Sequence, residues 1–262
     1  MTTLKLTGSI GTGKSKKGIP HNDPSDFLKV RDRFVQLGFN WVQSKTTPDK
    51  EFIKLIKLFQ SICKGNRRVE GGDGRIDLHG NTHRWLAAKN APGWVNMENK
   101  RGFGYRCVKV DYENSYATTW MRDSLVRAGI YYSAITLLNP SPPMWVRDFS
   151  RYKGGKTKGH GSHQTGLNVD MRLPVKDSIK YDKHLHFKHG VNDKKYKKLF
   201  DRESAKAQLK AIKVCMTNNK KSKILFNDPE LRKAHLCNHY KNHGGHYHIS
   251  ILPPARSDGI YK

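Results

Sequence analysis

Two histidine-rich segments carry the residues whose types and spacing could do chemistry, GHGSHQTGLNVDMRLP at 159–174 and NHGGHYHISILPP at 242–254. In the second segment, His246 and His248 are separated by one residue within a strand-like run. Successive side chains of a strand point to opposite faces. Both imidazoles should therefore lie on one face of a strand, with Tyr247 on the other.

The first segment adds a carboxylate and a third histidine. The alternation in LNVDM predicts that Leu167 and Val169 are buried and that Asp170 points to the opposite face. His163 precedes Asp170 by seven residues, across a Gln-Thr-Gly turn that can fold the imidazole back toward the carboxylate. The two segments together offer two imidazoles and one carboxylate on neighbouring strands.

Such a group would make three zinc ligands and leave a fourth tetrahedral position for water, which is the pattern of a catalytic site. Zinc lowers the pKa of its bound water from about 16 to about 7, which supplies a nucleophile for an amide carbonyl at neutral pH. A further histidine beside the metal could act as the base or stabilise the developing oxyanion. The alternative is a set of ordinary surface histidines around an aspartate, and the spacing alone leaves it open.

The first part of the chain predicts three helices. PSDFLKVRDRFVQLGF has apolar residues at a helical period, with Ser25 as the expected N-cap and Gly38 as the stop. DKEFIKLIKLFQSIC places its large apolar residues on one face of a second helix. GNTHRWLAAKN predicts a short third helix that ends before Pro92.

From about Asn99 the sequence mixes short strand-like runs with helical pieces. YRCVKVDY, KILFND and HYHISIL are β-prone, whereas SYATTWMRDSLVRAG and the basic stretch DKKYKKLFDRESAKAQLKAIKVCM favour helices. This mixture predicts an α+β fold.

The charge is strongly unbalanced, with 49 Lys and Arg against 22 Asp and Glu and a formal net charge of +27. A field of that size favours a polyanionic partner, either nucleic acid or the anionic bacterial envelope.

Several other features exclude classes of protein. No run of eighteen apolar residues occurs, so we expect no membrane span. MTTLKLTGSIG has no apolar core behind a basic start, so we expect synthesis in the cytoplasm without a secretory signal. The four cysteines form no CxxC pair, which argues against a zinc knuckle and leaves one disulfide open.

The stretch GSIGTGKS, Gly8 to Ser15, matches the phosphate-binding loop pattern G-x-x-x-x-G-K-[ST]. That loop needs a helix directly after its Lys and Ser, because the helix N-terminus cradles the phosphate. The residues that follow, KKGIPHNDPSD, contain a glycine and two prolines and cannot form one. We therefore interpret the stretch as a Gly-rich loop without a nucleotide.

A family resemblance joins three stretches, HGSHQTGLNVD at 160–170, FNDP at 226–229 and HGGHYH at 243–248. Together they resemble the penicillin-insensitive murein endopeptidases, over roughly residues 110–252. The resemblance implies the antiparallel-sheet zinc peptidase fold shared by lysostaphin-type and D-alanyl-D-alanine peptidases and by hedgehog signalling domains.

The same resemblance implies roles for six residues: zinc would be bound by His163, Asp170 and His248, His246 would be the catalytic histidine, and His160 and His243 would line the site. Asn168 stands where the family commonly has Asp, which leaves the ligands intact and changes the groups behind them.

About the first 90 residues resemble a three-helix peptidoglycan-binding module. Its turn before the third helix would be DGRIDLHGNT, with Asp73 and Asn81 ordering backbone amides. The sequence therefore predicts a three-helix, peptidoglycan-binding-like domain at 1–95 and a zinc peptidase domain at 96–262.

The expected function is zinc-dependent hydrolysis of peptidoglycan, as a D,D-endopeptidase on stem-peptide cross-links in the periplasm or cell wall. An injected antibacterial effector, with an immunity protein or a secretion-machine component as partner, and a phage lysin both fit the missing signal. The alternatives are a zinc D-Ala-D-Ala carboxypeptidase, a catalytically inactive hedgehog-like binding module, and a basic nucleic-acid-binding protein. Only KKYKK suggests the last, so we expect no nucleic acid partner.

Overall fold

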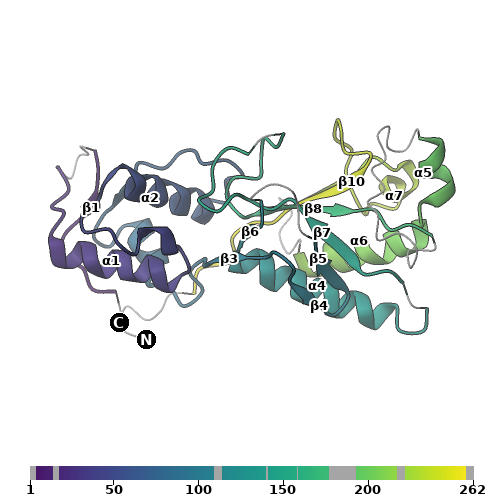
Figure 1. The fold of residues 1–262 in the computed structure, drawn as a ribbon, viewed down its shortest axis with the longest axis horizontal. Coiled ribbons are helices and arrows are strands. Elements are labelled where there is room, and N and C mark those ends of the chain that lie inside the picture. The colour runs from purple at the N-terminus through teal and green to yellow at the C-terminus, as the bar shows by residue number, and fades with distance from the viewer. Residues whose placement is uncertain are drawn as a thin grey trace.

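A computed structural model describes residues 4–13, 18–108, 114–139, 141–157, 159–176, 193–216 and 222–257. The molecule is elongated, with the N-terminal helices at one end and a mixed helix and sheet part at the other (Figure 1). Helices combined with a mainly antiparallel sheet confirm the α+β class. One hydrophobic cluster contains residues from both ends, so the domain boundary near residue 95 stays a prediction.

Helix α1, Pro24–Gln36, begins at a cap that the sequence analysis missed. The N-cap is Asp23, whose side chain accepts hydrogen bonds from the backbone amides of Ser25 and of the residue after it. The prediction of Ser25 as N-cap is therefore wrong. Pro24 takes the first helical position, where its missing N–H would have no intrahelical partner.

The end of α1 agrees with the prediction. Gly38 follows the helix with a φ of +89°, a backbone conformation that residues other than glycine rarely adopt. A Cβ at this position would lie 2.2 Å from the carbonyl oxygen of Trp94. Gly38 therefore stops the helix and lets the backbone at Trp94 approach it closely.

The remaining elements of the N-terminal part are α2 (Lys50–Cys63), α3 (Asn81–Ala87), the 3-10 turn η1 (Asn40–Val42), and the paired strands β1 (Ile10–Gly11) and β2 (Arg75–Ile76). Phe27 and Phe34 of α1 pack against Phe52 and Phe59 of α2, with ring centroids 4.8 to 5.7 Å apart. These rings are buried and form the centre of the three-helix arrangement.

The turn before α3 fits only half of its prediction. Asp73 accepts a hydrogen bond from the backbone amide of Arg75 at 3.0 Å, as expected. The N-cap of α3 is Gly80, with no side-chain cap, and Asn81 instead accepts a hydrogen bond from Arg256 at 3.1 Å. The expectation that Asn81 orders backbone amides is therefore wrong.

The Gly-rich loop is held by its own chain. The buried carboxylate of Asp26 accepts hydrogen bonds from the backbone amides of Thr7 and Gly8, at 2.6 and 2.9 Å. The amide of Gly11 donates to the Asn22 side chain at 2.8 Å. Two amides of the motif, those of Gly8 and Gly11, thus already have partners, which supports the rejection of a nucleotide site. Lys14 and Ser15 of the motif lie outside the described residues.

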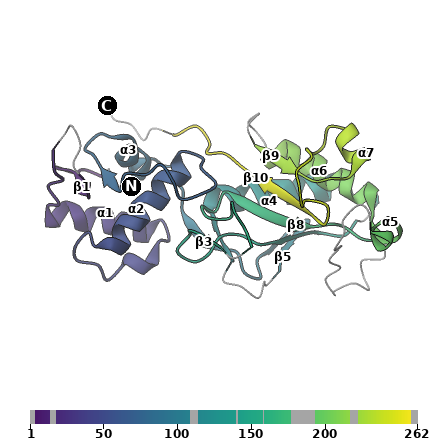
Figure 2. The same cartoon turned by 90° about the horizontal axis from the view of Figure 1, so that it is seen from above.

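The second part is built on a six-stranded sheet in the order β4 (Arg101–Gly102), β5 (Tyr105–Cys107), β7 (Met144–Arg147), β8 (Asn168–Arg172), β10 (His246–Ser250), β9 (Lys223–Leu225). Its neighbours pair antiparallel, except that β5 and β7 are parallel. Strands β8 and β10 lie side by side, with β9 beside β10 at the edge of the sheet (Figure 2). In that pair Asp170 is directly opposite His248.

Helices α4 (Thr119–Ile135) and α6 (Arg202–Met216) pack against each other along one face of the sheet (Figure 1). The small sheet of β3 (Trp94–Asn96) and β6 (Tyr116–Thr118) leads into α4, and the short helix α7 (Pro229–Lys233) follows β9. Across the described part of the chain, no helix is both long and apolar enough to span a lipid bilayer. The four cysteines are unpaired.

The basic stretch that the sequence predicts as one helix is two. Helix α5 (Lys194–Leu199) ends before the buried Phe200, and α6 begins at Arg202. Asp201 separates them and accepts hydrogen bonds from both the backbone amide and the hydroxyl of Ser204. The break occurs because burial of Phe200 and the cap at Asp201 outweigh the helical propensity of the lysines.

Candidate active site

Strands β8 and β10 position three of the predicted site residues. Asp170 on β8 and His248 on β10 are paired in register, and His246 lies two residues before His248 on the same face. The alternate residues Val169 and Tyr247 are fully buried on the other side. This confirms the alternation that the sequence predicts for both strands.

The loop before β8 brings two more histidines to the same face. The backbone at Thr157 bridges that at His160, and the Thr157 hydroxyl donates to the carbonyl oxygen of His163 at 3.3 Å. Gly166 ends the loop with a φ of +70°, and its amide donates to the Ser150 hydroxyl at 2.7 Å. The predicted turn between His163 and the strand therefore does fold the imidazole back.

Three atoms converge at the centre of the site. His248 Nδ1 lies 2.8 Å from Asp170 Oδ1, His163 Nε2 lies 3.2 Å from the same oxygen, and the two nitrogens are 3.1 Å apart. All three side chains are buried. The cluster lies on the floor of an open groove.

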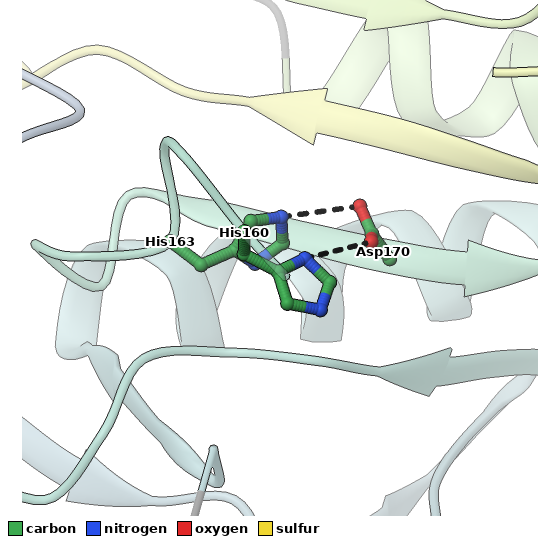
Figure 3. A group of neighbouring side chains, drawn as sticks. All are labelled: His160, His163 and Asp170. Atoms are coloured by element: carbon green, nitrogen blue, oxygen red, sulfur yellow. Dashed lines mark ion pairs between the residues drawn. The ribbon is translucent and has the colours of Figure 1, made fainter. Parts of the chain in front are cut away.

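Two further imidazoles face the second carboxylate oxygen. His160 Nδ1 is 3.7 Å and His246 Nε2 is 3.5 Å from Asp170 Oδ2. Figure 3 shows the rings of His160 and His163 turned toward Asp170. The His243 ring lies beside those of His246 and His248, with centroids 5.1 and 5.3 Å away. All six predicted site residues therefore line one groove.

The donor atoms fit a metal ion. Ligands of tetrahedral zinc at about 2.0–2.1 Å stand about 3.4 Å from one another. The three central atoms are slightly closer than this, as expected for atoms that hydrogen-bond to each other where an ion would separate them. His160, His163 and Asp170 also form a possible metal-binding group, with donor atoms within 4.8 Å of one another. The donor atoms do not identify the metal. With His163 and Asp170 as two ligands, either His160 or His248 could be the third.

The protonation states of Asp170 and of three imidazoles suit a metal site. Burial alone would raise the pKa of Asp170, but the charge of His163 and hydrogen bonds from His163 and His248 hold it well below its usual value. Burial lowers the pKa of His246, of His248 and of His160 against the attraction of Asp170. At neutral pH the carboxylate is ionised and these three imidazoles are neutral, which is the state that metal binding requires. Burial alone would lower the pKa of His163, but the charge of Asp170 and the hydrogen bond to it raise that pKa, so an ion bound by His163 competes with a proton.

A chain of hydrogen bonds behind the site fixes the orientation of His248. Asn168, fully buried, donates from Nδ2 to the Ser162 carbonyl oxygen at 2.8 Å, which leaves its Oδ1 to accept from Ser250 at 2.6 Å. The Ser250 oxygen can then accept from His248 Nε2, 3.3 Å away. This arrangement accepts the tautomer with the His248 proton on Nε2, in which Nδ1 can bind an ion in place of its contact with Asp170.

Sequence reasoning did not identify Ser250. The available signal was its spacing, two residues after His248 in the same strand. Nor did it identify the loop at 65–70, after α2, which lines the same groove of about 710 Å³ from the N-terminal part.

The comparisons with known proteins agree with this geometry. A family model described as penicillin-insensitive murein endopeptidase matches residues 93–256, a span that contains all six site residues. A search of curated proteins found no significant match.

Proposed function

The chain belongs to the penicillin-insensitive murein endopeptidase family, whose model matches residues 93–256 of 262, and we propose that it is a zinc-dependent D,D-endopeptidase that cuts cross-links between peptidoglycan stem peptides. Membership of the family supports a peptidase of peptidoglycan. The observation that carries the finer proposal is the convergence of His163 Nε2, Asp170 Oδ1 and His248 Nδ1 on the floor of the groove.

In this proposal His163, Asp170 and His248 hold the ion. Bound zinc would polarise the scissile carbonyl and acidify a water molecule. The carboxylate supplies negative charge in a buried place, and the Asn168–Ser250 pair keeps the His248 nitrogen directed at the ion.

His246 is proposed to move the proton. Its side chain is 30% exposed to the groove, so it can reach a substrate, and its lowered pKa keeps it neutral at pH 7. A neutral imidazole can accept a proton from the attacking water and return it to the leaving amine.

His243 and His160 are proposed to stabilise the oxyanion. His243 lines the groove, and its Nδ1 lies 2.8 Å from the Lys241 carbonyl oxygen, which only accepts, so Nδ1 carries a proton and the second ring nitrogen is Nε2. When protonated, that nitrogen can donate to a developing negative charge. His160 is partly exposed beside Asp170 and can donate in the same way.

The products of a purified peptidoglycan dimer test the proposal. An endopeptidase converts the dimer into two monomers, whereas a carboxypeptidase removes only a terminal D-alanine, and mass spectrometry separates the two results. We expect monomers with zinc, none after chelation, and recovery when zinc is returned. Uncut dimer at full zinc occupancy would contradict the proposal.

The N-terminal residues 1–95 are proposed to hold the enzyme on its polymer. Their three packed helices support the predicted resemblance to a peptidoglycan-binding module. The proposed place of action is the periplasm or cell wall, reached by injection as an antibacterial effector or by release as a phage lysin. Expression in a Gram-negative host with an added export signal should cause lysis, and expression without one should not.

A further inference from the structure

One wall of the catalytic groove comes from the loop at 65–70, after α2, which lies outside the family match at 93–256. Three hydrogen bonds join this loop to the loop at 160–166 that precedes β8 and carries His160 and His163. Arg68 Nε donates to the Gly161 carbonyl oxygen at 3.1 Å, and the Val69 amide donates to the Gln164 side chain at 3.2 Å. The Thr165 hydroxyl donates to the carbonyl oxygen of Asn66 at 2.7 Å.

The loop is equally well fixed to α2. The buried hydroxyl of Ser61 accepts from the Glu70 amide at 3.1 Å and shares its one proton between the carbonyl oxygens of Lys57 and Glu70, at 2.8 and 3.0 Å. The Asn66 amide donates to the Ser61 carbonyl oxygen at 2.9 Å. Because both ends of the loop are held, its side chains are presented to the groove in a preformed arrangement.

The groove walls are cationic. Their charged residues are Arg67 and Arg68 on the loop, Lys223 and Lys241 on the opposite side, and Glu70 as the one exposed carboxylate among the described lining residues. Asp170, on the floor, is surrounded by imidazoles. A substrate that enters between the two walls therefore meets an excess of positive charge.

Arg67 differs from its neighbour. Arg68 donates a hydrogen bond from Nε to the Gly161 carbonyl oxygen. Arg67 is half-buried and has no hydrogen bond or ion pair with any residue that the structure describes. Partial burial of an unpaired guanidinium costs free energy that an anion can recover. The planar fork of Arg matches a carboxylate with two parallel hydrogen bonds.

We propose that Arg67 binds a free carboxylate of the peptide substrate beside the scissile amide, and that Arg68 is a positioning residue that locks this subsite onto the His160–His163 loop. The proposal rests on the proposed peptidase function. It gives the N-terminal part a role in substrate specificity, in addition to its proposed binding of the polymer.

Two soluble peptidoglycan dimers test the subsite, one with free stem-peptide carboxylates and one with these carboxylates amidated. In Arg67→Ala we expect KM for the free dimer to rise about 10- to 100-fold, the range for a lost charge-assisted pair, with kcat within about threefold. The amidated dimer should be cut equally by wild type and variant, because it lacks the group that Arg67 binds.

Arg84→Ala is the matched control. Arg84 is an exposed arginine on α3 that does not line the groove, so its loss changes the net charge equally. It should leave both KM values unchanged. An equal rise of KM for both dimers in Arg67→Ala, or the same rise in Arg84→Ala, would overturn the proposal.

A binding measurement separates this proposal from the peptidase function. Calorimetry with free and amidated stem-peptide monomers, which contain no cross-link, should show tighter binding of the free form to wild type and no preference in Arg67→Ala. If wild type cuts neither dimer but shows this preference, the endopeptidase proposal fails and the subsite stands. If it cuts the dimers and shows no preference in KM or in binding, the subsite fails alone.

Discussion

Asp170 determines what the surrounding histidines can do, because its two oxygens face different groups. Oδ1 is shared by His163 and His248, and Oδ2 faces His160 and His246 at 3.7 and 3.5 Å. The tightly packed group around Oδ1 suits a bound ion, and the looser group around Oδ2 leaves room for a substrate. This difference supports the separate binding and proton-transfer roles that we propose.

His246→Ala should separate those two roles. We expect the variant to keep its zinc, because its three proposed ligands remain, and to lose about 10²- to 10⁴-fold in kcat, the usual contribution of proton transfer by a side chain. Elemental analysis and dimer hydrolysis measure the two quantities. Turnover at the wild-type rate would show that His246 is not the base.

Ser250→Ala tests the hydrogen bonds behind the site. Removal of the hydroxyl frees His248 Nε2 and leaves the buried Asn168 Oδ1 without its donor. Loss of such a supporting group commonly weakens metal binding about 10- to 100-fold. We expect that loss in a competition titration with a chelator, with activity restored by excess zinc.

Ser124→Ala provides the comparison, since Ser124 is a buried serine on α4 with no contact to the site residues. Equal zinc affinity in the two serine variants would mean that Ser250 does not support the metal site.

The sequence predicts the site residues better than it predicts the contacts that hold them in place. The period of two places His246 and His248 on one face, and the structure bears this out. The contact between Arg68 and Gly161 joins residues 93 positions apart, and no local pattern encodes such a contact. Asp170 lies opposite His248 because two strands 78 residues apart pair in one register, which spacing within either strand does not fix.

At the scale of elements, the Gly-rich loop and helix α1 depend on one carboxylate. Asp26 is fully buried, and it accepts hydrogen bonds from Thr7, from Gly8 and from Lys29 Nζ at 2.9 Å. Burial alone would raise the pKa of Asp26, but these partners lower it from 3.8 to about 2. The ionised carboxylate therefore stabilises the folded state.

This pKa shift predicts a pH dependence of stability. Because the folded pKa is depressed, the stabilisation is fully present above about pH 4 and is lost as the pH falls through about 2. Asp26→Asn should lower the free energy of unfolding by about 2 kcal/mol at pH 7, and the difference from wild type should shrink between pH 4 and 2. Urea unfolding at several pH values measures it.

Asp32→Asn on the same helix, where the side chain is 57% exposed, should show no comparable loss at pH 7. A constant difference between Asp26→Asn and wild type down to pH 2 would contradict the assigned ionisation.

Helices were predictable where one strong signal dominated. The apolar period of α1 and α2 and the stop at Gly38 are encoded locally. The prediction of a helix failed where tertiary packing set the backbone conformation. Burial of Phe200 divides the basic stretch into two helices. Ser25 failed as an N-cap because Asp23 followed by Pro24 competes more strongly for the same helix start.

At the scale of the molecule, contacts from several parts of the chain join the N-terminal helices to the sheet part. Phe39 stacks on Trp94 with ring centroids 5.8 Å apart, and Lys153 forms an ion pair with Glu51. Near the C-terminus, the Ser257 amide donates to the Asn90 side chain at 2.8 Å. These contacts keep the 65–70 loop over the groove.

The net charge of +27 predicts salt-dependent binding to the wall. Cations that face a polyanion release its counterions, so affinity falls steeply as salt rises. Between about 50 and 300 mM salt we expect loss of sedimentation with purified sacculi, while kcat for a soluble amidated dimer stays within a few-fold. Tighter binding to duplex DNA than to sacculi at matched salt, with no dimer cut, would favour the nucleic-acid alternative.

Zinc content measured together with dimer cleavage, in wild type and four single variants, tests the central claim most directly. We predict about one zinc per chain in wild type and in His160→Ala, with zinc and cleavage both lost in His163→Ala, Asp170→Ala and His248→Ala. Full zinc in those last three variants, or cleavage by protein without metal, would contradict the account.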